Sequence, residues 1–295
     1  MAITGVVSRV VRMDESQWSR STGAQGLDAA LMGASTSSFV ELLHQLHPEA
    51  LTPISGQYSG QAQPTRATTI VAVKYRDGVL MAGDRRATRG NEIAQRDIEK
   101  VFVADDHTLI GVAGAAGMAI DLARLFGLEL SHYEKIEGES LSFAGKANRL
   151  ATIIGEKLAL ALQGFVVVPL LAGWDDRARR GRIVSYDATG GHYEETEFAS
   201  IGSGAAFARG SLKKLHYSDL DEDEAALVCI QALFDAADDD SATGGPYLIR
   251  AIYPVIMSSS SRGVHVFEES GVAELTTTMM TSRGSRPNGP QAASS

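Results

Sequence analysis

The sequence has 295 residues, 44% of them hydrophobic, so it can bury one large core and needs no more than about two domains. Its formal net charge of −9 argues against nucleic acid or an anionic membrane as a main partner, because both repel an acidic surface. The single cysteine, Cys229, excludes an intrachain disulfide and favours the cytoplasm, and the lack of HExxH or CxxC spacings and of long apolar runs predicts no metal, no cofactor and no membrane span.

Residues 1–67 differ in composition from the rest of the chain. They are rich in Ser, Gly, Gln and Thr, and only residues 38–46 have the apolar spacing of a helix before Pro48 ends it. The first 30 residues contain no unbroken apolar stretch of the kind found in a secretory signal. We therefore interpret residues 1–67 as a leader rather than as a folded domain.

A β-branched run begins abruptly at Thr68. Residues 68–75 are followed by an Asp-Gly pair, the favoured composition of a tight hairpin turn, and then by the apolar residues 79–82. This pattern predicts a β-hairpin. Two further strands are predicted at residues 101–103 and 108–113.

Two long helical patterns follow these strands. One extends from about residue 118 to residue 130, and the other has leucine or isoleucine at every fourth position, at residues 150, 154, 158 and 162. Each pattern has one apolar stripe, so we expect both helices to lie on a sheet. Strands are then predicted at 166–172 and 182–186, and a third helix opens at the acidic residues 221–224, because carboxylates favour a helix N-terminus.

The end of the sequence combines two more strands with a polar tail. The strands are predicted at 248–257 and 264–267, whereas residues 276–295 have no apolar period and are predicted to be disordered. The helices are thus grouped between strand pairs that read as antiparallel. This order favours an α+β layered sandwich over a parallel, doubly wound sheet.

Three familiar motifs are nearly present. The Gly-Ser-Gly run at 202–204 is followed by Phe207 where a dinucleotide fingerprint needs a third glycine or alanine, and the Gly-Lys pair at 145–146 lacks the spacing of a P-loop. Ile201 stands where a G-x-S-x-G nucleophile elbow would need its first glycine. The sequence therefore supports neither nucleotide binding nor a serine hydrolase of that type.

The remaining candidates are weak when taken one by one. A threonine that opens a strand, such as Thr68, is usually only a β-former, and a lone Asp84 or Lys100 would usually be a solvated surface charge. These three residues, however, occur together with further segments, at residues 69–73, 81–88, 201–204, 213–215 and 238–246. In this combination the sequence resembles the β subunits of proteasomes, in particular the actinobacterial kind, from Thr68 to about Leu275.

The resemblance implies the N-terminal-nucleophile hydrolase fold, a four-layer αββα sandwich of two antiparallel sheets flanked by helices. It also implies a propeptide, residues 1–67, that is removed by autocleavage between Ala67 and Thr68, and a catalytic domain at residues 68–275. The family usually has glycine before the mature threonine. Because Ala67 adds a methyl group where the attack needs a tight turn, we expect slow removal of the leader.

The resemblance also assigns roles to single residues. Thr68 would be the nucleophile, and Asp84 would hold Lys100 in place beside it. Three residues would orient the terminal amine and relay protons: Ser203, Asp240 and Thr243, the last at a position where the family commonly has serine. The oxyanion would be stabilised by the backbone N–H of Gly114. Five residues would bind the substrate: Ala87, Thr88, Ile98, Val112 and Ala116.

These assignments make chemical sense for an N-terminal threonine. A threonine hydroxyl needs a base, and Thr68, once it is the first residue, carries that base as its own α-amine. The amine has a reference pKa of about 7.7–8.0 and must be neutral to accept a proton, so a nearby cation such as Lys100 helps. The implied pocket is apolar and uncharged, which predicts chymotrypsin-like cleavage, although ordinary core packing is the alternative for Ala87, Ile98, Val112 and Ala116.

The resemblance further implies an assembly. Seven-membered β rings would stack between rings of separate α subunits, and an ATP-dependent unfoldase ring would deliver unfolded, tagged proteins. One alternative is a non-catalytic ring subunit of the same fold, which the residue types at positions 68, 84 and 100 argue against. A second is the simpler two-ring bacterial peptidase that also begins Thr-Thr-Ile, which the longer mature part and the acidic segment 238–246 argue against.

Overall fold

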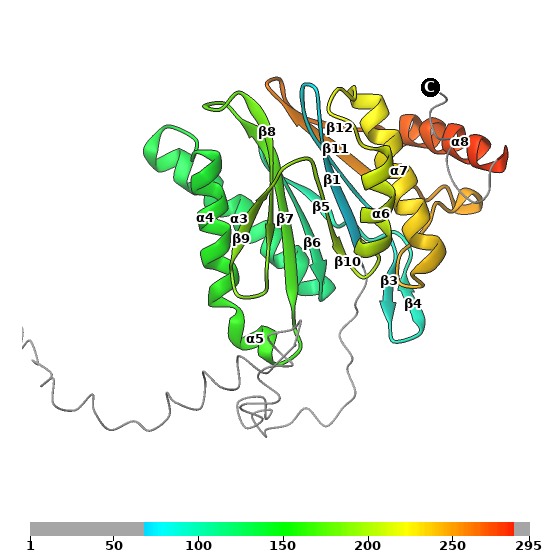
Figure 1. Ribbon diagram of the computed structural model, residues 1–295. Helices are drawn as coiled ribbons and strands as arrows, with labels where there is room; N and C mark the ends of the chain where they lie inside the picture. The colour runs from blue at the N-terminus through cyan, green and yellow to red at the C-terminus, as the bar shows by residue number, and fades with distance from the viewer. Residues whose placement is uncertain (1–67, 286–295) are drawn as a thin grey trace, which may run out of the picture. The chain divides into compact units, whose positions relative to one another are not determined.

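Two antiparallel five-stranded sheets form the centre of the fold (Figure 1). The computed structural model describes residues 68–285, so the predictions for residues 1–67, including the helix at 38–46, and for 286–295 lie outside this part of the chain. The first sheet has the strand order β10-β1-β2-β11-β12, with bounds Phe198–Gly202, Thr69–Tyr75, Gly78–Gly83, Val255–Ser260 and Gly263–Val266. The second has the order β5-β6-β7-β8-β9, with bounds Val101–Asp105, Thr108–Gly114, Val167–Asp175, Arg180–Tyr186 and His192–Glu195.

Helices cover the outer face of each sheet. On the second sheet they are α3 and α4, followed by the short α5, with bounds Ala116–Glu137, Phe143–Glu156 and Leu158–Leu162. On the first sheet they are α6, α7 and α8, with bounds Ala205–Leu215, Glu222–Asp239 and Glu269–Ser285. A hairpin of β3 and β4 and a short 3-10 helix, η3, complete the described part, with bounds Ala87–Arg89, Glu92–Gln95 and Leu248–Arg250. Within residues 68–285, none of these helices combines the length and apolarity that a membrane crossing requires.

Three hydrophobic clusters separate four layers. Strand β1 shows how the sequence builds them, because alternate side chains of a strand point to opposite faces. Val71 and Val73 pack toward α7, whereas Ile70 and Ala72 pack between the two sheets. A third cluster lies between the second sheet and helices α3 and α4. Burying each valine or isoleucine contributes about 1.5–3 kcal/mol. The predicted αββα sandwich is confirmed.

The predicted third helix is also confirmed. It is α7, which begins with a capping box in which the Asp221 side chain accepts from Glu224 N–H and the Glu224 side chain accepts from Asp221 N–H. Cys229 lies on the buried face of α7, and burial raises the pKa of its thiol. The cysteine therefore acts as a small apolar side chain.

Two elements differ from the prediction. The helix expected through residues 150–162 is divided, because α4 ends at Glu156 and none of the residues in α5 is buried. The strand expected at 248–257 begins only at Val255, since the chain first forms η3 and then places Ala251 at a positive φ of 50°. Helix α6 was not predicted, because only one of its buried residues, Leu212, is a large apolar one, and the others, Ala208 and Ser211, are small.

The prediction of a disordered tail from residue 276 is wrong for residues 276–285, which belong to helix α8. The buried residues of α8 are Val272, Thr276 and Met279, and a threonine in this stripe hides the apolar period. Near the end of the helix, Arg283 pairs with Asp235 of α7, with side-chain exposures of 11% and 21%. Packing against α7 therefore orders a segment whose own sequence pattern is weak.

Replacing Arg283 by glutamine should lower the free energy of unfolding by about 1–3 kcal/mol, because Asp235 loses a charged partner in a largely buried place. The matched control is Arg149→Gln, which removes a guanidinium from Glu129 at a more exposed site, with side-chain exposures of 42% and 27%. This control should cost under about 1 kcal/mol. Thermal unfolding of both variants checks the difference, and equal losses would contradict the docking of α8 through Arg283.

Candidate active site

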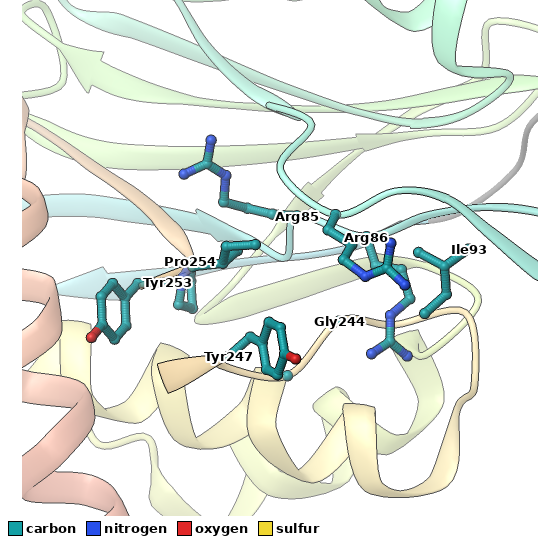
Figure 2. A pocket seen from close by; sticks show the side chains of 10 residues that line it. Arg85, Arg86, Ile93, Gly244, Tyr247, Tyr253 and Pro254 are labelled. Atoms are coloured by element: carbon teal, nitrogen blue, oxygen red, sulfur yellow. The ribbon is translucent and has the colours of Figure 1, made fainter. Parts of the chain in front are cut away.

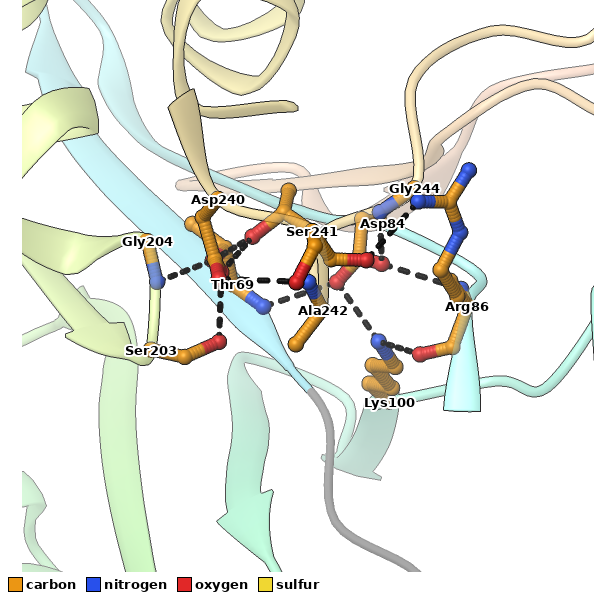
Figure 3. A network of polar contacts seen from close by, with 11 residues as sticks. Thr69, Asp84, Arg86, Lys100, Ser203, Gly204, Asp240, Ser241, Ala242 and Gly244 are labelled. Carbon is orange, nitrogen blue, oxygen red and sulfur yellow. Dashed lines mark hydrogen bonds and ion pairs between the residues drawn. The ribbon is translucent and has the colours of Figure 1, made fainter. Parts of the chain in front are cut away.

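Strand ends from both sheets bring Asp84, Lys100 and Ser203 beside the start of β1 (Figure 3). Strand β1 runs antiparallel to β2 and β10, so its first residues lie beside the last residues of both neighbours. Asp84 directly follows β2, Ser203 follows β10 and Lys100 precedes β5. Asp240 and Thr243 belong to the loop after α7. Residues that are far apart in the sequence therefore meet around the start of β1.

Asp84 accepts four hydrogen bonds. Its Oδ1 accepts from Lys100 Nζ at 2.5 Å and from the N–H of Thr69 at 2.7 Å. Its Oδ2 accepts from the N–H groups of Arg86 at 2.9 Å and Gly244 at 2.7 Å. The predicted pairing of Asp84 with Lys100 is confirmed, and the two residues are only 1% and 4% exposed. Four donors offset the cost of burying the carboxylate charge.

Lys100 is held from a second side as well. Its Nζ donates to the carbonyl oxygen of Arg86 at 2.6 Å. Burial lowers the pKa of the Lys100 ammonium below its usual range, and the neighbouring Asp84 carboxylate opposes this shift. The two acceptors fix the cation in one place close to the start of β1.

A second polar cluster is centred on Asp240. Its Oδ2 accepts from the hydroxyls of Ser203 and Thr243, both at 2.6 Å, and its Oδ1 accepts from the N–H of Ala242 at 3.2 Å. Burial acts to raise the pKa of Asp240, but these hydrogen bonds outweigh it and the pKa is lowered. Asp240 is therefore ionised at neutral pH. The structure brings the three predicted orienting residues together.

Thr68 is fixed through its carbonyl group. The N–H of Ser203 donates to Thr68 O at 3.0 Å, and Thr68 is 4% exposed. Gly202, the residue before Ser203, has a φ of 102°, and a Cβ atom on it would lie 1.7 Å from Thr68 O. Only glycine allows this approach without moving the chain. Gly202 thus sets the distance between the end of β10 and Thr68.

Gly114 is the last residue of β6, next to the start of α3. It has a φ of 120°, and a Cβ atom would lie 2.1 Å from the carbonyl oxygen of Val166. That same oxygen accepts from the N–H of Ala115 at 3.1 Å. The sequence therefore needs glycine here for the turn from strand to helix. The role of its N–H as an oxyanion donor remains a prediction.

The predicted substrate-binding residues fall into two groups. Ala87 and Val112 are each 1% exposed, and Val112 packs in the cluster beneath α3, so their side chains are core residues in the described chain. Thr88, in β3, is 9% exposed, and Ile98 is half-buried in the segment before β5. Ala116 lines a cavity of about 470 Å³ between the β3–β4 hairpin and the start of α3. The other predicted substrate-binding residues do not line this cavity.

A second cavity, of about 240 Å³, lies beside Asp84 but contains none of the predicted residues (Figure 2). Its lining includes Arg86 and Gly244, whose backbone N–H groups bind Asp84. Figure 2 shows the side chains of Arg85 and Arg86 extending in opposite directions. Arg86 NH1 donates to the carbonyl oxygen of Ser241 at 3.0 Å, which ties this wall to the loop of Asp240.

Sequence reasoning missed the contribution of Thr69. Its N–H binds Asp84, and its hydroxyl lies 2.6 Å from that of Thr243 and 3.0 Å from the N–H of Gly204. The only signal was its place next to Thr68, since threonine at the start of a strand is common.

Among residues 68–285, no group of three or more His, Cys, Asp or Glu side chains is placed to hold a metal ion. The arrangement supports acid, base and nucleophile chemistry by side chains.

Known proteins are similar in sequence to most of this chain. The profile of the family described as "Proteasome subunit" matches residues 65–252. The "Proteasome subunit beta" of Acidothermus cellulolyticus is 52% identical over 263 residues, covering 87% of this chain and 90% of the relative. That of Streptomyces griseus is 46% identical and covers 93% and 98%. The "Proteasome subunit beta 2" of Thermomonospora curvata is 49% identical and covers 91% and 96%. The chain therefore belongs to the proteasome subunit family, among its β subunits.

Proposed function

We propose that this chain is a catalytic β subunit of the proteasome core, a threonine endopeptidase whose nucleophile is Thr68. The observation that carries the proposal is the Lys100–Asp84 ion pair beside the start of β1, bonded at 2.5 Å and almost fully buried. A non-catalytic subunit of the same fold would have no need for a buried cation at this place, where it is costly. The completeness of the site favours the catalytic alternative.

In the proposed reaction, Thr68 supplies both the nucleophile and the general base. The α-amine of Thr68 takes the hydroxyl proton, and Oγ1 attacks the peptide carbonyl of the substrate. The N–H of Gly114 stabilises the oxyanion, a contribution of about 3–4 kcal/mol. The leaving amine takes the proton and an ester with Thr68 remains, which water then hydrolyses. Lys100 keeps the α-amine neutral, while Ser203, Asp240 and Thr243 orient it.

The same hydroxyl would remove the leader, residues 1–67. In the precursor the nitrogen of Thr68 is an amide without a basic lone pair, so the base for substrate cleavage does not yet exist. Thr68 Oγ1 attacks the carbonyl of Ala67, the Ala67–Thr68 peptide bond becomes an ester, and water opens it. This cut frees the amine. The folded part that follows, expected as a domain of residues 68–275, would then be active.

The proposed assembly rests on the similarity to β subunits of proteasomes and on the resemblance of the sequence to that family. Seven copies would form a ring, and β rings would stack with heptameric α rings in the cytoplasm. An ATP-dependent unfoldase ring would supply unfolded, tagged proteins. The reaction outlined above needs no metal or cofactor, and it involves neither nucleic acid nor a membrane.

Assembled particles should cleave fluorogenic peptides best when Tyr, Phe or Leu precedes the reporter. The proposed pocket residues, Ala87, Ile98, Val112 and Ala116, carry no charge, and Ile98 and Ala116 are the two whose side chains are not in the core. The measurement is kcat/KM for a matched peptide series on particles whose new N-terminus is verified by sequencing. Peptides ending in Arg or Asp serve as controls. Faster turnover of these controls would contradict the proposed apolar pocket. If no peptide is cleaved, the proposed peptidase activity is contradicted.

A further inference from the structure

We propose that Thr69 is a positioning residue whose hydroxyl completes a one-way chain of hydrogen bonds from Gly204 to Asp240. The inference rests on the proposed peptidase function, because it assigns a task to the residue after the nucleophile. Nothing in the roles described above uses this hydroxyl. The side chain is nevertheless fully buried in the centre of the site.

The chain consists of three short contacts. The N–H of Gly204 donates to Thr69 Oγ1 at 3.0 Å, Thr69 Oγ1 lies 2.6 Å from Thr243 Oγ1, and Thr243 Oγ1 lies 2.6 Å from Asp240 Oδ2. Ser203 Oγ reaches the same Asp240 oxygen at 2.6 Å. The two threonine hydroxyls therefore each have a polar neighbour on both sides.

Elementary hydrogen-bond chemistry fixes the direction of each bond. A backbone N–H can only donate, and the ionised carboxylate of Asp240 can only accept. Thr243 has one hydroxyl hydrogen, so donating it to Asp240 leaves its oxygen as an acceptor. The hydrogen between the two threonines must then come from Thr69, whose own oxygen accepts from Gly204. No other arrangement satisfies all three contacts.

Thr69 also joins the two polar clusters. Its N–H donates to Asp84 Oδ1 at 2.7 Å, the same oxygen that binds Lys100, while its hydroxyl belongs to the Asp240 cluster. One residue next to Thr68 therefore contacts both sets of groups proposed to act on the Thr68 amine. Fixing Thr69 from both sides fixes the residue before it.

Gly204 provides the space for this chain. Its φ of −85° and ψ of 7° are open to any residue, so the backbone does not require glycine. A Cβ atom at this position, however, would lie 2.6 Å from both Thr69 Oγ1 and Thr243 Oγ1. An added methyl group would push the two hydroxyls apart. The glycine is needed for the hydrogen bonds themselves.

The test compares Thr69→Val, Thr69→Ser and Gly204→Ala in assembled particles. We expect Thr69→Val and Gly204→Ala each to lower kcat for an apolar peptide at least about tenfold, with KM within about twofold, since removing a hydrogen-bond partner inside a site typically costs that much. Thr69→Ser retains the hydroxyl and should stay within about threefold of wild type. Intact mass is recorded so that rates refer to chains without the leader.

A matched control and a double variant separate positioning from folding. Gly210→Ala, in the same helix as Ala205, adds a methyl group where nothing lies within 4 Å and should behave as wild type. Because Thr69→Val and Gly204→Ala break one chain, combining them should reduce kcat no further than either alone. Losses that multiply, or wild-type kcat in Thr69→Val with only a lower melting temperature, would overturn the inference. A wild-type particle without peptidase activity would instead contradict the proposed function, and the role of Thr69 with it.

Discussion

Particles assembled from Thr68→Ala chains should keep residues 1–67 and hydrolyse no peptide. Both outcomes have one cause, because the proposed nucleophile for leader removal and for substrate cleavage is the same hydroxyl. Loss of a nucleophile lowers turnover by at least about a thousandfold. Intact mass and N-terminal sequencing report on the leader, and a fluorogenic apolar peptide reports on turnover.

Thr68→Ser is the matched control, since it keeps a hydroxyl and an α-amine. It should lose its leader and retain a measurable part of the activity. The time course of leader removal can be compared with that of an Ala67→Gly chain, which should be faster if the methyl group of Ala67 hinders the turn. Wild-type particles that are fully active while still carrying Met1 to Ala67 would refute the proposed mechanism.

Lys100→Ala should abolish peptide hydrolysis and leader removal together at neutral pH. In a chain that begins at Thr68, loss of the cation raises the pKa of the amine, so the amine stays protonated and cannot accept the hydroxyl proton. In the precursor, which has no free amine, the Thr68 hydroxyl loses the nearby positive charge that favours its deprotonation. Because a higher pH deprotonates the amine again, Lys100→Ala chains produced without residues 1–67 should recover part of their activity as the pH is raised. The measurement is kcat against pH for particles with a verified N-terminus.

Lys146→Ala is a matched control for Lys100→Ala. Lys146 is a second buried lysine, 5% exposed, and its Nζ binds Asp105 at 2.8 Å and Thr108 at 3.0 Å in the layer beneath α4. Removing one partner of a buried ion pair costs about 3–5 kcal/mol in either case. Lys146→Ala should therefore lower the melting temperature but leave kcat of the surviving particles unchanged. Equal kinetic damage in both variants would show that Lys100 acts only through stability.

Much of the site could be predicted because its segments, taken together, resemble those of a known family, whereas Thr68, Asp84 and Lys100 are weak signals one by one. In the structure, pairing of β1 with β2 brings Asp84 beside the start of β1, and stacking of the second sheet on the first brings Lys100, next to β5, to the same place. The hydroxyl of Thr69 could not be assigned in the same way. Its partners, Thr243 and Gly204, lie more than a hundred residues away, and only the packing of α6 and α7 against β1 reveals them.

The errors in the fold also have physical origins. Helix α8 is held by Arg283 and by a buried stripe containing Thr276, so its order comes from α7 rather than from its own periodicity. The strand expected before Val255 is replaced by a turn at Ala251 whose positive φ no local pattern announces. In α8, tertiary contacts override the intrinsic preference of the segment, whereas the turn at Ala251 is closed by local backbone hydrogen bonds between Tyr247 and Ile252.

Strand β1 lies between β10 and β2, so the chain end that leader removal would create starts a strand with a partner on each side. A new terminus usually frays, because its first residues lose the restraint of the chain before them. Here Thr69 is paired with Gly202 on one side, Ile70 is paired with Gly83 on the other, and the carbonyl of Thr68 is bound by Ser203. The amine released by the cut would thus be presented at a very high effective concentration to the hydroxyl it serves, with almost no search of conformations.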